Sequence, residues 1–224
     1  ASGIPITISR IMVKHNSLKN QENSYKTVSA GIILSLVLSI PIVTLFWFLP
    51  NTFSFIFTDK RCFTLLRIVL PGVVITSVYA VIRGYFWGKK KFLTYSLIEL
   101  AEEVIMLIFG IILVTQATSM MEGVTQAGYA VLYSYIFSFV TALIFFFSSG
   151  GKLRSPKGEL KPLIVSATPI TTMRTVTSLI NTLIAIILPA RLVLSGVSHT
   201  NALASFGELS GMSIPLIYIP STLI

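Results

Sequence analysis

The sequence predicts an all-α polytopic membrane protein, a bundle of helices that crosses the bilayer several times. Of its 224 residues, 54% are hydrophobic and only 11% are charged, whereas soluble domains carry about a quarter charged residues. Mean hydropathy is correspondingly high, at +0.84. The apolar residues gather in runs with the length of about 20 residues that a membrane-crossing helix needs, and most charges lie between the runs.

Applying this length criterion along the chain gives a series of helical segments. Residues 1–13 are expected to be the end of a helix that starts earlier. Complete spans are expected at 27–49, 63–86, 92–115, 123–148 and 162–190, and a last helix begins within 202–224. Because the chain starts without Met and ends inside an apolar run, it is expected to be a fragment of a longer protein.

The basic residues occupy alternate loops between these segments. Lysine and arginine are concentrated in residues 14–26, 87–91 and 149–161, so these three loops are predicted to be cytoplasmic by the positive-inside rule. The same rule accounts for the net charge of +9, and nucleic-acid binding is therefore not expected.

Residues for covalent chemistry or metal binding are not evident. Cys62 is the single cysteine, and His15 and His199 match no metal-ligand spacing. Phosphate-binding loops and nucleophile elbows are also missing from the sequence. The protein is expected to be no enzyme, with no catalytic residue, no metal site and no cofactor other than a coupling proton or sodium ion.

The segment Leu97–Leu107, "LIELAEEVIML", holds three of the eight acidic residues within an apolar run. With Lys91 at the membrane edge, Glu99 lies roughly 12 Å and Glu103 roughly 18 Å deep. Glu102 lies between them, and the i, i+3, i+4 spacing puts all three on one face of a helix. A central acidic residue costs about 2.5–3.5 kcal/mol in lipid, so this face is predicted to turn toward the protein interior or a water-filled cavity.

Other charges are predicted at similar depth, and their roles divide by sign. Crowded carboxylates do not all ionise together, which makes the three glutamates and Glu208 candidates for handling a coupling cation. Arg174, Arg67 and Arg10 are candidates for binding an anionic substrate, although Arg10 and Arg83 lie nearer the helix ends and are interpreted as snorkelling. The alternative is that the glutamates and Arg174 form static pairs that hold helices together.

Prolines within or near the helices are candidate hinges. Pro5, Pro169 and Pro215 are the ones singled out, because a proline removes a helical hydrogen bond and bends the axis. Kinks needed only for packing are the alternative for most of them.

Three stretches resemble a known family. "GIPITISRIMVKHN" at Gly3–Asn16, "IRGYFWGKKKF" at Ile82–Phe92 and "PARLVLSGVS…ASFGELSGMSIPLIYIPSTLI" at Pro189–Ile224 are similar to the stage V sporulation protein B group of the multidrug/oligosaccharidyl-lipid/polysaccharide exporter superfamily. The resemblance implies two six-helix lobes. Residues 1–148 would be helices 2–6, residues 149–161 a basic inter-lobe loop, and residues 162–224 helices 7–8.

The resemblance also implies a function. Such proteins are flippases of the bacterial plasma membrane that translocate lipid-linked oligosaccharide or cell-wall precursors by alternating access, coupled to an ion gradient or the membrane potential. Where the group carries a Glu-Gln pair followed by Arg, this chain has Glu102, Glu103 and Met106, which favours a cation-coupling role. The alternatives are a multidrug/cation antiporter, or a membrane scaffold that recruits wall-synthesis or sporulation proteins through residues 149–161.

Overall fold

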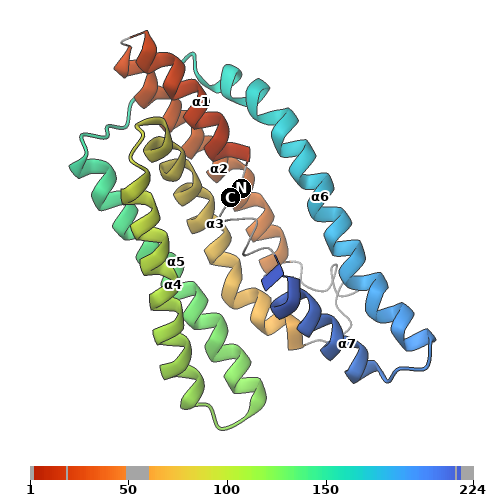
Figure 1. The fold of residues 1–224 in the computed structure, drawn as a ribbon. Helices are drawn as coiled ribbons and strands as arrows, with labels where there is room; N and C mark the ends of the chain where they lie inside the picture. Colours follow the sequence, from red (N-terminus) through yellow and green to blue (C-terminus); the bar gives the residue numbers. More distant parts are fainter. Residues whose placement is uncertain (1–2, 19, 49–60, 215, 218–224) are drawn as a thin grey trace. The chain divides into compact units, whose positions relative to one another are not determined.

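The computed structural model describes residues 3–18, 20–48, 61–214 and 216–217 (Figure 1). Within these residues the secondary structure is helical and no strand occurs, which confirms the predicted all-α membrane fold. The helices are α1 (Gly3–Ser17), α2 (Gln21–Phe48), α3 (Arg61–Gly88), α4 (Phe92–Thr115), α5 (Met120–Ser148), α6 (Leu160–Leu194) and α7 (His199–Glu208), followed by a π-helical turn at Leu209–Ser213.

The chain divides into two compact units, residues 1–171 and residues 172–224. The first unit contains α1 to α5, the segment between α5 and α6, and the beginning of α6. The second contains the rest of α6, α7 and the π-helical turn, and nearly all of its described side chains are exposed. The buried core and the polar clusters described below all belong to the first unit.

In the described part of the chain, four helices are long and apolar enough to cross a membrane. They are α2, α3 from Thr64 onward, α5 and α6. Helix α4 has 24 residues, which corresponds to about 36 Å, but its three glutamates set it apart from these four. Helix lengths and compositions of this kind are those of a multi-pass membrane protein.

Several helices extend beyond the spans predicted from hydropathy. Helix α2 begins at Gln21, not at residue 27, because its polar first turns continue the backbone hydrogen bonding outside the apolar run. Helix α5 begins at Met120 because the Ser119 side chain accepts a hydrogen bond from the Glu122 backbone N–H at 3.2 Å and caps the helix. Hydropathy predicts which residues lie within the lipid, whereas a helix ends where its backbone N–H and C=O groups form hydrogen bonds outside the helix.

Small residues let the helices of the first unit approach closely. Helix α3 packs against α1, α2 and α5. A Cβ atom on Gly84 of α3 would lie only 2.8 Å from the carbonyl oxygen of Pro5 in α1, and one on Gly31 of α2 would lie 2.7 Å from a methyl group of Ile8. Such close approach is typical of helix packing in membranes, where small residues form the interfaces.

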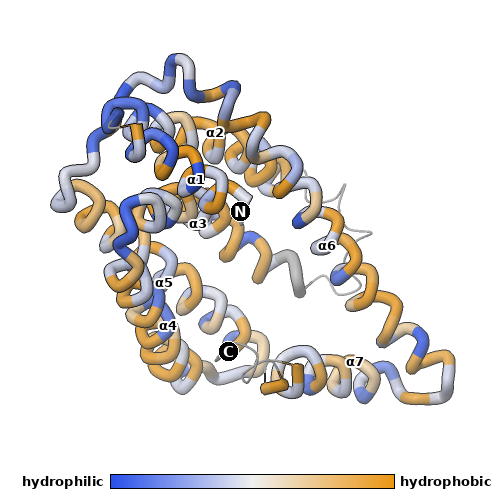
Figure 2. The backbone as a smooth tube through the Cα atoms, turned by 45° about the horizontal axis from the view of Figure 1, so that its top comes forward, coloured by the Kyte–Doolittle hydropathy of each residue, from blue (hydrophilic) through white to orange (hydrophobic). Residues whose placement is uncertain are grey.

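The turns that carry the basic residues lie at one end of the first unit. Asn16 near the end of α1 donates a hydrogen bond to the Gly88 carbonyl at the end of α3, at 3.3 Å, and Glu159 before α6 contacts His15 of α1. Figure 2 shows hydrophilic residues along the segment that precedes α6 and around the neighbouring helix ends. The predicted alternation of basic loops requires the three turns to share one end of the bundle, as they do here. That this end faces the cytoplasm stays a prediction.

Candidate functional site

A cavity of about 500 Å³ lies between α3 and α4. From α3 it is lined by Thr76, Tyr79, Ala80 and Arg83, and from α4 by Glu99, Leu100, Glu102 and Glu103. The four α3 residues follow an i, i+3, i+4, i+7 spacing and therefore occupy one face of that helix. The structure thus brings the three glutamates of α4 together opposite a single face of α3.

A short turn sets which residues of α3 and α4 face each other. Lys90 takes a left-handed backbone conformation (φ 58°), and the Lys91 N–H donates to the Phe86 carbonyl at 2.9 Å, so the chain reverses within three residues. Arg83 and Glu99 each lie eight positions from Lys91. In an antiparallel helical hairpin with this turn, the two side chains meet at the same height.

Arg83 is held by groups on both helices. Its Nη1 donates to Glu99 Oε1 and to the Tyr95 hydroxyl, both at 3.2 Å. Its guanidinium also lies over the Trp87 ring at 5.4 Å and the Tyr95 ring at 5.7 Å. Whereas the sequence interprets Arg83 as snorkelling, the structure pairs it with a carboxylate on the neighbouring helix.

The cavity has a negative charge balance and unused hydrogen-bonding groups. Three glutamates face one arginine, a formal excess of two negative charges when all are ionised (three minus one). Glu102 is half-buried and Glu103 is exposed. The Tyr79 hydroxyl and the Arg83 Nε are buried and have no hydrogen-bond partner among the described residues. These atoms are available to a bound molecule.

The carboxylates line a wall of the cavity instead of converging on one point. Within the described residues, no group of three His, Cys, Asp or Glu side chains is arranged to hold a metal ion. A species that interacts with several of the glutamates together must therefore extend along the wall, whereas a proton needs only one of them.

The remaining predicted site residues do not line this cavity. Arg10 in α1 and Arg67 in α3 are exposed. Arg174 in α6 and Glu208 at the end of α7 are also exposed and belong to the second unit. Among the hinge candidates, Pro5 is buried in α1, Pro169 is exposed within α6, and Pro215 lies outside the described residues.

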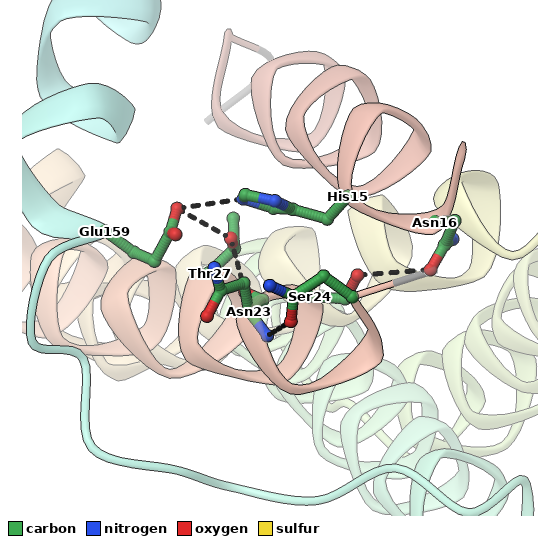
Figure 3. Close-up of polar contacts among 7 residues, drawn as sticks. His15, Asn16, Asn23, Ser24, Thr27 and Glu159 are labelled. Carbon is green, nitrogen blue, oxygen red and sulfur yellow. Dashed lines mark hydrogen bonds and ion pairs between the residues drawn. The ribbon is translucent and has the colours of Figure 1, made fainter. Parts of the chain in front are cut away.

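A second polar cluster joins the segment before α6 to α1 and α2 (Figure 3). Glu159 is only 8% exposed, and its Oε2 lies 3.2 Å from His15 Nε2 and accepts a hydrogen bond from Thr27 Oγ1 at 3.2 Å. On the neighbouring turns, Ser24 Oγ donates to Asn16 Oδ1 at 3.1 Å. The cluster therefore links three separate parts of the chain through buried or half-buried side chains.

Further contacts attach the same segment to the bundle. The Arg154 N–H donates to Ser29 Oγ of α2 at 2.9 Å, and the Gly151 N–H donates to the Phe146 carbonyl at 2.9 Å. Leu163, in the first turn of α6, is fully buried in the core. Sequence reasoning missed this docking. The one available signal was Glu159 itself, the only acidic residue in a basic stretch.

Comparison with known proteins identifies the family. Residues 1–221 match the family described as polysaccharide biosynthesis protein. The chain is 22% identical over 233 residues to stage V sporulation protein B of Bacillus subtilis (strain 168), a match that covers 98% of this chain and 45% of that protein. It therefore spans less than half the length of this relative. No solved structure matches the chain. The resemblance to the stage V sporulation protein B group is confirmed, and the chain belongs to the polysaccharide biosynthesis protein family.

Proposed function

We propose that this chain is part of a flippase that moves a lipid-linked oligosaccharide or cell-wall precursor across the bacterial plasma membrane by alternating access. The family description connects the chain to polysaccharide biosynthesis, and the name of its relative connects that protein to sporulation. A helical bundle whose cavity is lined by ionisable groups supports translocation of such a product. In this proposal the loops at 14–26, 87–91 and 149–161 are cytoplasmic, and no covalent chemistry takes place.

The observation that carries the proposal is the cavity between α3 and α4, with its three glutamates and one arginine. Ionisable groups at membrane depth are unfavourable unless they serve a pathway or are neutralised, and among the three glutamates of the cavity it is Glu99 that forms the ion pair with Arg83 in the described residues. In this proposal Glu102 and Glu103, which form no ion pair with Arg83 in the described part of the chain, exchange a proton or sodium ion during the transport cycle. Arg174, Arg67 and Arg10 remain candidates for the phosphate groups of the substrate, and Pro5, Pro169 and Pro215 for hinges.

A multidrug/cation antiporter is a second candidate, and the charge of the cavity favours it. Carboxylates together with the Tyr79 side chain in the lining of one cavity suit an organic cation, which is attracted both by negative charge and by aromatic faces. A scaffold for wall-synthesis or sporulation proteins differs from both transporters, because it requires neither accessible nor titrating glutamates.

Thiol labelling of the intact protein tests for an accessible pathway. Single cysteines replace Glu99, Glu102 and Glu103 in turn on a Cys62→Ser background, and a membrane-impermeant thiol reagent is applied to intact cells and to inverted vesicles. Labelling of position 102 from both sides is expected for alternating access. Protection from both sides would contradict a transport pathway and support the scaffold.

A transport assay separates the two transporter classes. Glu102→Gln is expected to stop translocation of a fluorescent lipid-linked glycan in proteoliposomes, while Glu22→Gln, at an exposed position outside the cavity, leaves it unchanged. If Glu102→Gln stops only the efflux of an aromatic cation and leaves glycan translocation intact, the antiporter is favoured instead.

A further inference from the structure

Residues 149–161, the segment between α5 and α6 with the first two residues of α6, expose charge of one sign only. Between residues 149 and 161 its exposed charged side chains are Lys152, Arg154, Lys157 and Lys161. Its only acidic residue, Glu159, is turned inward onto His15 and Thr27. The burial of Glu159 therefore leaves four exposed cations without an exposed carboxylate from the same segment.

These cations are carried by a docked segment instead of a free loop. Glu159 attaches its end to α1 and α2, and the hydrogen bond from the Arg154 N–H to Ser29 Oγ fixes its middle on α2. Glu22, an acid in the first turn of α2, is paired with Lys26 at 3.0 Å. A partner that binds here meets a preformed surface and loses little affinity to ordering it.

A groove of about 440 Å³ lies beside Arg154. It is lined by Ser29, Ile32 and Ile33 of α2 and by Leu153, Arg154 and Ser155 of the docked segment. Ile33 is 41% exposed, and Val37, one helical turn further along α2, is 61% exposed. The apolar wall of the groove thus continues onto the exposed side chains of a membrane-spanning helix, while Arg154 lines its other wall.

We propose that this groove binds an anionic phospholipid of the bilayer. The Arg154 guanidinium and the Ser155 hydroxyl bind the phosphate, and an acyl chain lies along Ile32 and Ile33. Arginine presents a planar fork of donors that matches phosphate oxygens, and basic clusters next to cytoplasmic helix ends attract acidic lipids. The inference rests on the membrane orientation in the proposed function but not on transport itself.

Native mass spectrometry of the intact detergent-solubilised protein tests the assignment. Phosphatidylglycerol, phosphatidylcholine and undecaprenyl phosphate are titrated separately against the wild type and two charge-matched variants. Lys152→Gln/Arg154→Gln removes two cations from the docked segment, and Lys90→Gln/Lys91→Gln removes two from the turn between α3 and α4 at the same end. Circular dichroism and gel filtration verify that each variant is folded.

The wild type is expected to prefer phosphatidylglycerol over phosphatidylcholine. The docked-segment variant should lose roughly tenfold or more of that preference, whereas the turn variant should change it less than about twofold. Equal losses in both variants would mean diffuse attraction without a site and would overturn the proposal. Binding of undecaprenyl phosphate with no preference for phosphatidylglycerol would overturn the assignment to a bilayer phospholipid, because the groove would then belong to an isoprenoid substrate.

Discussion

Arg83 is the residue on which the charge balance of the α3–α4 cavity depends. The side chains of Arg83 and Glu99 are 22% and 42% exposed, so their hydrogen bond is partly shielded from water. In an Arg83→Met variant, Glu99 loses its cationic partner. We expect the free energy of unfolding to fall by about 1–2 kcal/mol, measured by thermal unfolding in detergent.

Two further variants make this prediction specific to the pair. Glu99→Gln introduced together with Arg83→Met should restore part of the lost stability, because an uncharged amide needs no cationic partner. Arg67→Met removes an exposed arginine from the same helix and should change stability by less than about 0.5 kcal/mol. If the double variant is as unstable as Arg83→Met or less stable, Arg83 does not act through Glu99.

The contact between α1 and α3 depends on the missing side chain of Gly84. A Cβ atom there would lie 2.8 Å from the Pro5 carbonyl oxygen and 3.0 Å from Ile8 Cβ, and neither atom can rotate away. Gly84→Ala should therefore push the helices apart and lower the free energy of unfolding by about 1–3 kcal/mol. Gly110→Ala in α4 is the matched control. Nothing lies within 4 Å of its Cβ position, so it should be neutral or stabilising by up to about 1 kcal/mol in the same unfolding measurement.

The docking of the segment before α6 can be measured by limited proteolysis. Trypsin sites at Lys152, Arg154 and Lys157 lie on it, and its docking contacts should slow their cleavage in inverted vesicles. Glu159→Ala removes the contacts to His15 and Thr27. We expect cleavage about tenfold faster, which corresponds to ~1.4 kcal/mol of lost docking energy.

A substitution far from the segment controls for general loosening of the protein. Glu122→Ala, at the start of α5, should leave the cleavage rate unchanged. Fast cleavage of the wild type at all three sites would contradict the docked arrangement.

At the level of elements, the sequence predicts where the helices lie along the chain. It does not predict which side chains of neighbouring helices meet, or which segment docks onto the bundle. Hydrophobic runs located the ends of α3, α4 and α5 within three residues, because the length of an apolar run is a local property, whereas α2 begins six residues before its predicted span. The partner of Arg83 depends instead on the three-residue turn after Gly88. Arg83 and Glu99 lie at equal distances along the sequence from Lys91 in this turn, and this spacing predicts their contact in a helical hairpin. The burial of Glu159 is marked in the sequence only by its being the single acid of residues 149–161, because a basic, glycine-containing stretch otherwise has the composition of a solvated loop.

The placement of the basic turns at one end of the first unit predicts a single topology. Cysteines introduced at Ser17, Lys90 and Ser155 on a Cys62→Ser background should react with an impermeant thiol reagent in inverted vesicles and not in intact cells. A cysteine at Thr118, in the turn between α4 and α5, should show the opposite pattern. Labelling of position 90 in intact cells would contradict this orientation.

At the scale of the whole chain, composition is sufficient to predict the class of protein but not to predict how the residues of the candidate site are paired. Low charge and high hydropathy predicted a membrane bundle, and the family match agrees with the resemblance found in three stretches of sequence. The glutamates were identifiable because acidic residues in an apolar run are conspicuous. The sequence offers Arg174 as a counter-charge only as an alternative and interprets Arg83 as snorkelling, whereas the structure pairs Arg83 with Glu99.

The hairpin of α3 and α4 has a consequence for biosynthesis. With three carboxylates, α4 partitions poorly from the translocon into lipid when it is considered alone. Helix α3 leaves the ribosome first and already carries Arg83, and the tight turn after Gly88 lets Glu99 meet that arginine as soon as α4 has formed. The two helices are therefore suited to enter the bilayer together as one insertion unit. Loss of Arg83 would then lower the amount of protein that reaches the membrane before it affects any activity there.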